Sequence, residues 1–171
     1  MSAAPIIRLG TQGWSYPDWV GTFFPPSSKQ EHYLPFYAEV FDTVELDTTF
    51  YRPPRPSVVR SWARHTPEGF RFTAKVPHAI THTARLAEMG EQMQAFARAL
   101  EPLGERLGPL LLQMPAEFER DPGTVSLLDH FLAATPSAVR LAVEFRHRSW
   151  HRDETYDLMR ARHAVLAWTQ W

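Results

Sequence analysis

Four apolar runs of the sequence each contain polar side chains whose chemistry is complementary. These runs are VELDTTFY with Glu45 and Asp47, FTAKVP with Lys75, LLLQMP with Gln113, and LAVEFRH with Glu144 and Arg146. A carboxyl group can donate or accept a proton during a reaction, and a lysine can stabilise the negative charge that develops. These residue types indicate a site for acid–base chemistry, with Glu45 and Glu144 as acid and base and Lys75 as the stabilising charge.

The spacing of these residues predicts that they share one site. Residues two apart on a strand point to the same face, so Glu45 and Asp47 are expected to lie together. A buried charge without a partner costs on the order of several kcal/mol, so these carboxylates need counter-charges nearby. Lys75 and Arg146 can supply them for Glu45 and Glu144. The alternative is a purely structural network that closes a sheet and fixes its register.

Strand-like and helix-like patterns alternate along the whole chain. The strand-like runs span residues 5–14, 42–51, 70–77, 108–115, 139–147 and 164–170. Between them, apolar residues recur at helical spacing. This alternation predicts parallel βαβ units in one α/β domain that spans residues 1–171.

Five helices are expected between the strands. The first lies within residues 27–41, where Ser28 and Glu31 have the spacing of a capping box and Pro35 is expected to introduce a kink. The second is expected to begin near Pro56, because proline is favoured in the first turn of a helix. The others are expected at about residues 89–107, 124–134 and 153–162.

Two α/β architectures fit this order of elements. A doubly wound sheet usually has a glycine-rich first turn, and GTQGW at residues 10–14 lacks the required glycine spacing. A TIM (β/α) barrel needs no such loop, and its active site lies at the C-terminal ends of the strands. The polar residues above lie near those ends. The sequence therefore predicts a TIM-type barrel with six parallel strands in sequential order.

The chain is short for a complete barrel. A (β/α)₈ barrel typically has about 250 residues, whereas this chain has 171. We therefore expect an incomplete barrel of about six strands, and we interpret the chain as C-terminally truncated. The alternative is an open barrel that covers its exposed sheet edge by forming a dimer.

Composition and charge restrict the class of protein. The chain has 18 Lys and Arg against 19 Asp and Glu, so no overall field favours nucleic acid or an anionic membrane. The absence of cysteine excludes a thiolate nucleophile, disulfides and cysteine-bound metal clusters. No apolar segment has the length of a membrane span. We expect a soluble, cytoplasmic protein with no membrane partner, and the sequence indicates no particular cofactor.

Two histidines follow the third strand-like run. His78 and His82 are four residues apart, a spacing that suits metal binding when both lie on a helix. Pro77 directly before His78 favours a loop instead, so we predict no metal site. His82 alone is a candidate for proton transfer or for a hydrogen bond to a substrate, because histidine titrates near neutral pH.

Aromatic and basic residues near the strand ends are candidates for substrate binding. Trp14, Tyr16 and Tyr51 can stack on a sugar or a base, or can simply fill the mouth of a barrel. The basic run from Arg146 to Arg152 can hold a small anionic ligand such as phosphate through arginine forks, or can be solvated. The predicted substrate-binding residues are Trp14, Tyr16, Asp47, Tyr51, Gln113 and Arg146.

Three classes of function are compatible with these residues. The favoured class is an enzyme that uses acid–base chemistry on a small polar substrate, phosphorylated or sugar-like, in which Lys75 can alternatively form a Schiff base. The second is a barrel that binds or processes nucleic acid and stacks bases on aromatic side chains, against which the near-neutral charge argues. The third is a binding or structural protein without catalysis.

Five motifs, taken together, resemble those of a known family. In chain order they are GTQGWSYPDWVGTFFPP, FDTVELDTTFYRPP, FRFTAKVPHAITH, LGPLLLQMP and LAVEFRHRSW. This combination resembles the YecE-like family, or domain of unknown function 72, over essentially the whole chain. The resemblance implies a TIM-barrel fold without an established activity.

The resemblance also implies a set of shared residues, with two departures. Asp47 stands where the family usually has asparagine, which adds a negative charge to the site. The sixth strand-like run ends in WTQW, where an aspartate is common in the family, so a role for that acid has no counterpart here. The matching positions are Gly13, Trp14, Tyr16, Trp19, Glu45, Phe50, Tyr51, Lys75, Thr81, His82, Gln113, Pro115, Glu144, Arg146 and Trp150.

Overall fold

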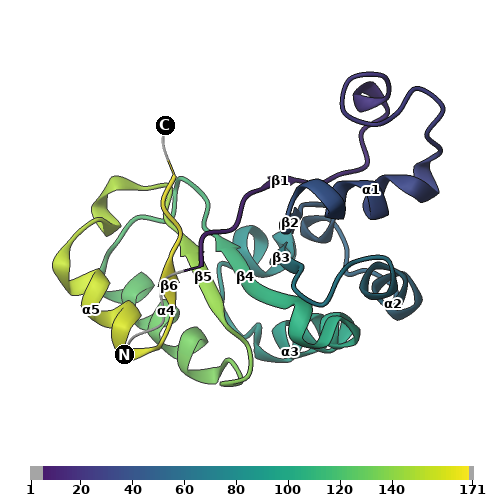
Figure 1. Ribbon diagram of the computed structural model, residues 1–171. Coiled ribbons are helices and arrows are strands. Elements are labelled where there is room, and N and C mark those ends of the chain that lie inside the picture. Colours follow the sequence, from purple (N-terminus) through teal and green to yellow (C-terminus); the bar gives the residue numbers. More distant parts are fainter. Residues whose placement is uncertain (1–5, 170–171) are drawn as a thin grey trace, which may run out of the picture.

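The sheet has six parallel strands in sequential order (Figure 1). The computed structural model describes residues 6–169. Sequential parallel order confirms the predicted barrel-type topology and excludes the doubly wound alternative, in which the strand order reverses. The strands are β1 (Gly10–Gln12), β2 (Thr43–Leu46), β3 (Arg71–Lys75), β4 (Leu107–Gln113), β5 (Leu141–Glu144) and β6 (Val165–Leu166).

Five α-helices connect the strands, one in each crossover. The second begins at Pro56, as predicted, because a proline at the start of a helix removes an N–H that has no intrahelical acceptor. The fourth begins with a capping box, in which the Asp121 carboxylate accepts from the backbone N–H of Thr124. The helices are α1 (Tyr33–Val40), α2 (Pro56–Arg64), α3 (Gly90–Leu100), α4 (Pro122–Ala134) and α5 (Asp153–Ala161).

The start of α1 and the end of α3 differ from the sequence-based expectation. No side chain caps the 3-10 turn Gln30–His32 that precedes α1, so the spacing of Ser28 and Glu31 does not form a capping box. Pro35 is the third residue of α1, where a backbone N–H has no intrahelical acceptor to lose, and the helix continues past it. The expected helix 89–107 ends at Leu100 because Gly104, with φ of 55°, interrupts the following turn.

The two faces of the sheet have different environments. Strand residues that point toward the helices are fully buried, as Val44, Phe72 and Leu110 show. Residues on the opposite, concave face are partly exposed, and this alternation follows from the two-residue period of a strand. The polar strand ends therefore lie on a face that solvent can reach.

A tyrosine joins the edge strand β1 to the rest of the sheet. The backbone N–H of Thr11 donates to the Tyr37 hydroxyl at 2.7 Å, and that hydroxyl donates to the Thr43 carbonyl at 3.0 Å. Burial raises the pKa of Tyr37, so the hydroxyl keeps its proton and its donor role. This contact fixes the short strand that ends at Gln12.

Within residues 6–169, no helix is both long enough and apolar enough to cross a membrane.

Candidate acid–base site

The strand register brings the predicted polar residues to one edge of the sheet. Gln12 of β1 lies opposite Glu45 of β2, and Gln113 of β4 lies opposite Glu144 of β5. Lys75 is the last residue of β3, between these two pairs in the sheet. Because the strands are parallel, all five residues lie toward the C-terminal end of the sheet, where β/α barrels have their active sites.

The centre of the site is an ion-paired lysine. Lys75 Nζ lies 3.0 Å from Asp47 Oδ1 and 3.9 Å from Glu45 Oε1. The Gln12 side-chain amide donates to both carboxylates, at 3.2 Å to Glu45 Oε1 and 3.1 Å to Asp47 Oδ1. One cation and one amide therefore hold two carboxyl groups in a fixed arrangement. We call these four residues, Gln12, Glu45, Asp47 and Lys75, the acid–base cluster.

A turn, rather than strand alternation, places Asp47 in this cluster. Asp47 follows the last residue of β2 and has helical backbone angles, with φ of −78° and ψ of −33°. The buried Thr49 hydroxyl contacts the carbonyls of both Leu46 and Lys75 at 2.7 Å. The hydroxyl thus fixes the turn after β2 against the end of β3, which aligns Asp47 with Lys75.

Glu45 has an unusual environment for a carboxyl group near solvent. Burial raises the pKa of Glu45, and the neighbouring Asp47 and Glu144 raise it further, while Lys75 and the Gln12 hydrogen bond act in the opposite direction. The net direction is upward, so Glu45 keeps its proton to a higher pH than an ordinary glutamate. A carboxyl group of this kind is suited to act as a general acid.

The second Gln–Glu pair, Gln113 and Glu144, contains a more deeply buried carboxyl group. Glu144 is only 5% exposed and accepts a hydrogen bond from the Gln113 amide at 2.9 Å. The charge of Glu144 also helps to raise the pKa of Glu45. The structure therefore brings Glu144 and Gln113 to the same rim as the acid–base cluster, but on the opposite side of Lys75 in the sheet.

His82 lies in a short π-helical turn, Ala79–Thr83, after β3. Its ring stacks on His78 at 4.7 Å and contacts Phe50 edge-on at 5.3 Å. Burial lowers the pKa of His82, and the charges of His78 and Arg146 lower it further, so the imidazole is neutral near pH 7. This places both His82 and Arg146 near one part of the rim. Among the described residues, no group of three or more His, Asp or Glu side chains is arranged to hold a metal ion.

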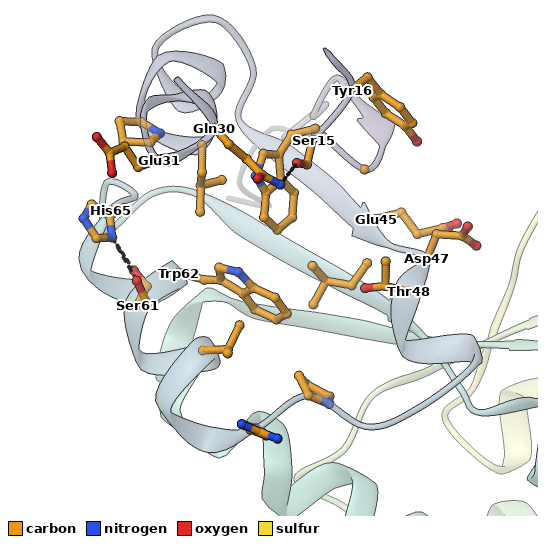
Figure 2. Close-up of a pocket in the computed structure, with 18 of the residues that line it drawn as sticks. Ser15, Tyr16, Gln30, Glu31, Glu45, Asp47, Thr48, Ser61, Trp62 and His65 are labelled. Carbon is orange, nitrogen blue, oxygen red and sulfur yellow. Dashed lines mark hydrogen bonds between the residues drawn. The ribbon is translucent and has the colours of Figure 1, made fainter. Parts of the chain in front are cut away.

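A cavity of about 1130 Å³ borders the acid–base cluster. In Figure 2, Glu45 and Asp47 lie on one side of this cavity, His65 and Glu31 lie on the other, and Trp62 is between them. Further lining residues from the loop after β1, from α1 and from the segment before α2 include Trp14, Tyr16, Gln30, Leu34, Arg52 and Arg55.

The aromatic candidates are not equivalent. Trp14 lines the cavity and packs edge-on against Trp62, with ring centroids 5.7 Å apart. Tyr16 also lines it, and its hydroxyl donates to the Gln12 carbonyl, which supports the strand end beside Glu45. Tyr51 is 80% exposed and does not line the cavity, because the turn after β2 directs its side chain to solvent.

Gln12, Arg52 and Arg55 were not predicted as site residues from the sequence. Gln12 ends the first strand at the same register as Glu45, and this repeats the relation between Gln113 and Glu144. A search for a polar residue at the end of every strand would have found it. Arg52 and Arg55 lie in a loop, so no strand periodicity indicates their position.

The chain matches the model of the family described as "Protein of unknown function DUF72" over residues 8–170. It belongs to the DUF72 family. This DUF72 chain is 37% identical over 142 residues to the UPF0759 protein YecE of Escherichia coli K12, which covers 83% of the chain and 49% of YecE. It is 30% identical over 163 residues to the UPF0759 protein YunF of Bacillus subtilis, which covers 89% of the chain and 55% of YunF.

Solved structures of the DUF72 family have the same fold. A DUF72 protein from Thermotoga maritima aligns with a TM-score of 0.80 at 37% identity, covering 92% of this chain and 62% of that one. One from Enterococcus faecalis aligns with a TM-score of 0.77 at 27% identity, covering 94% and 60%. These relatives support the predicted TIM-like fold. The DUF72 chain described here spans about half the length of the curated relatives it matches.

Proposed function

We propose that this protein is an enzyme that transfers protons on a small, polar, sugar-like substrate, with Glu45 as the general acid and Asp47 as the general base. The acid–base cluster is the observation that carries this proposal. Two carboxyl groups share the Gln12 amide, but only Asp47 is in close contact with the Lys75 ammonium, at 3.0 Å. Paired acids in different environments are the usual arrangement for separating donor and acceptor roles.

The environments of the two carboxyl groups support these roles. Burial raises the pKa of Glu45, which favours its protonated form. Asp47, whose carboxylate lies 3.0 Å from the Lys75 ammonium, is the proposed proton acceptor. Lys75 also provides positive charge where an oxyanion develops on the substrate.

The remaining rim residues support the same reaction class. The neutral His82 imidazole can accept or relay a proton. Gln113 and the buried Glu144 are joined by a hydrogen bond on the adjoining part of the rim, and the charge of Glu144 helps to raise the pKa of Glu45. The cavity of about 1130 Å³ beside Glu45 and Asp47 is large enough for a metabolite, with Trp14 and Trp62 available to contact the apolar face of a sugar ring.

A deuterium-exchange experiment across a range of candidate substrates tests this proposal. The protein is incubated in D₂O with a panel of aldoses, ketoses and their phosphates, and proton NMR records carbon-bound deuterium, isomers, elimination products and hydrolysis products. We expect turnover of at least one compound. Glu45→Gln and Asp47→Asn are each expected to lower the rate by about 100-fold or more, the usual effect of losing general acid–base catalysis.

The matched control is Asp157→Asn, which removes an exposed carboxylate on α5 far from the rim. It is expected to leave the rate unchanged. Circular dichroism and thermal melts must show that every variant is folded. Turnover that survives both Glu45→Gln and Asp47→Asn in folded proteins would overturn the assignment, as would an absence of turnover across the whole panel.

A further inference from the structure

The lining of the cavity includes two arginines without an assigned role. Arg52 and Arg55 lie in the segment that joins the turn after β2 to helix α2, and both line the cavity. Both are exposed, and within residues 6–169 neither guanidinium group forms an ion pair or a side-chain hydrogen bond. Two cations in a cavity wall without counter-ions favour an anionic ligand.

The sequence of this segment, RPPRP, restricts the backbone that carries the two arginines. Pro53, Pro54 and Pro56 have restricted φ angles, and a residue before proline is also held in an extended conformation. Arg55 has φ of −70° and ψ of 140°, the values of a polyproline II helix. Arg52 and Arg55 both line the cavity, and the prolines beside them restrict the backbone that carries them.

Rigidity has a consequence for binding. A flexible loop loses conformational entropy when it closes on a ligand, and a loop that is already fixed loses less. Three prolines in five residues make this segment one of the least flexible loops that the sequence can encode. The two guanidinium groups are thus already positioned before a ligand arrives.

The acidic side chains that line the cavity are Glu45, Asp47 and Glu31, and Glu31 lies across the cavity from the other two (Figure 2). Glu45 and Asp47 make their side of the cavity acidic, and Lys75 is already engaged by both of them. An anionic group is therefore repelled from that side and attracted to Arg52 and Arg55.

Between these two sides, Trp14 and Trp62 provide aromatic surface. Ser15 and Gln30, joined by a hydrogen bond of 2.9 Å, provide polar groups beside it. A ligand with a ring in this region contacts both aromatic and polar groups, while its charged end is directed by the arginines.

We propose that Arg52 and Arg55 form an arginine clamp that binds the phosphate of a phosphate monoester attached to a sugar or nucleoside ring. The ring lies against Trp14 and Trp62, and its polar end reaches Glu45 and Asp47. The clamp names the substrate class of the proposed enzyme. It rests on the proposed function only for the end of the ligand that reacts at Glu45 and Asp47.

Equilibrium binding, followed by titration calorimetry, tests the clamp without requiring turnover. The probes are glucose 6-phosphate and AMP, with glucose and adenosine as matched compounds that lack the phosphate. We expect at least one phosphorylated probe to bind about 10-fold or more tightly than its unphosphorylated partner. The double variant Arg52→Gln/Arg55→Gln is expected to remove that preference, since each charge-assisted bidentate contact contributes about tenfold in affinity.

The matched control is Arg60→Gln/Arg64→Gln, which removes two exposed arginines from the neighbouring helix α2 that do not line the cavity. The affinity of this control variant for the phosphorylated probe is expected to stay within about twofold of that of the unmodified protein, because exposed charges outside the cavity are screened by salt. Pro53→Ala/Pro54→Ala keeps both arginines and is expected to weaken binding by only about threefold, through added flexibility.

The outcomes separate the clamp from the proposed function. Preference for glucose 6-phosphate identifies a sugar phosphate as the ligand, and preference for AMP identifies a nucleotide. Equal affinity with and without phosphate, or a preference that survives Arg52→Gln/Arg55→Gln, overturns the clamp. Glu45→Gln is expected to keep the phosphate preference. A clamp that binds in a protein without proton-transfer activity would contradict the proposed function alone.

Discussion

Two Gln–Glu pairs occupy equivalent positions in the sheet but have different surroundings. Gln12 of β1 lies opposite Glu45 of β2, Gln113 of β4 lies opposite Glu144 of β5, and in each pair the amide donates to the carboxyl group. Glu45 also contacts Lys75 and lines a cavity, and Gln12 also donates to Asp47. In the second pair Glu144 is buried and Gln113 is partly exposed, and neither lines that cavity.

A stack of aromatic rings follows Glu144 in the chain. The Trp150 ring lies nearly parallel to Phe118 and to Phe145, with interplanar angles of 2° and 9°, and the Trp150 indole N–H donates to the Phe118 carbonyl. All three rings are almost fully buried. Glu45 therefore borders a cavity that a ligand can enter, whereas Glu144 is buried and is followed in the chain by Phe145, a member of this packed stack.

A position at the end of a strand does not by itself decide the role of a carboxyl group. Residues from turns and loops, such as Asp47 and Arg55, determine whether solvent and ligands reach it. Glu45 therefore carries the proposed chemistry, whereas Glu144, which the sequence predicts as its acid–base partner, contributes in this proposal to the field at Glu45. Four stability measurements test this distinction.

The largest effect is expected from Lys75→Met. This change leaves Asp47 and Glu45 without their counter-charge, and because the Lys75 side chain is only 13% exposed we expect a loss of about 3 kcal/mol in the free energy of unfolding. Urea denaturation at neutral pH measures it. Adding Asp47→Asn to Lys75→Met removes the nearest uncompensated charge and is expected to recover about 1 kcal/mol. If the double variant is no more stable than Lys75→Met, the pairing has no energetic importance.

The second effect compares the same substitution in the two pairs. Glu144→Leu removes the buried acceptor of the Gln113 amide and is expected to cost about 2 kcal/mol. Glu45→Leu is expected to cost less than about 1 kcal/mol, because solvent reaches Gln12 and Lys75 keeps its closer partner Asp47. Chemical denaturation of both variants measures the difference. Equal losses would show that the two pairs are energetically alike.

A smaller effect is expected of Glu45 on the pH dependence of stability. Burial raises the pKa of Glu45 above its ordinary value of 4.5, so the folded protein holds this proton more tightly than the unfolded chain. The resulting stabilisation is fully present below pH 4.5 and is lost as the pH rises through the folded pKa. The stability of the unmodified protein relative to Glu45→Gln should therefore fall across this window. A difference that rises with pH would mean that the Lys75 charge outweighs burial.

The smallest effect is expected at Asp129, which lies on α4 far from the rim. Two hydrogen bonds from Arg162, at 2.6 and 2.9 Å, lower the pKa of Asp129. Its contribution has the opposite sign, since it is present above the ordinary pKa of 3.8 and is lost as the pH falls through the lower folded value. In thermal melts, the deficit of Asp129→Asn relative to the unmodified protein should be largest at neutral pH and smaller near pH 3. A loss of thermal stability of the same size near pH 3 would show instead that the substitution removes packing.

Much of the fold could be predicted because strand and helix periods are local properties of the sequence. Apolar runs interrupted by polar ends identified the six strands, and their alternation with helices indicated parallel order. The start of α1 was misjudged because a Ser–Glu spacing favours a capping box only when the backbone already enters a helix at serine. Local spacing does not report that condition.

The site could be predicted only where strand geometry governs it. Glu45 and Lys75 follow from strand alternation, and Gln12 follows from the register between neighbouring strands. Tyr51 and the Arg52–Arg55 segment depend on the path of a turn and a loop, which has no period. Tertiary contacts such as the Thr49 hydroxyl set that path, and they join residues 26 positions apart.

The sequential strand order has a consequence for synthesis on the ribosome. Each strand pairs with the one made just before it, so the sheet can grow from its N-terminal edge while later strands are still being translated. Every member of the acid–base cluster lies between Gln12 and Lys75. Its ion pairs can therefore form as soon as the third strand leaves the exit tunnel, well before the chain that follows has been made.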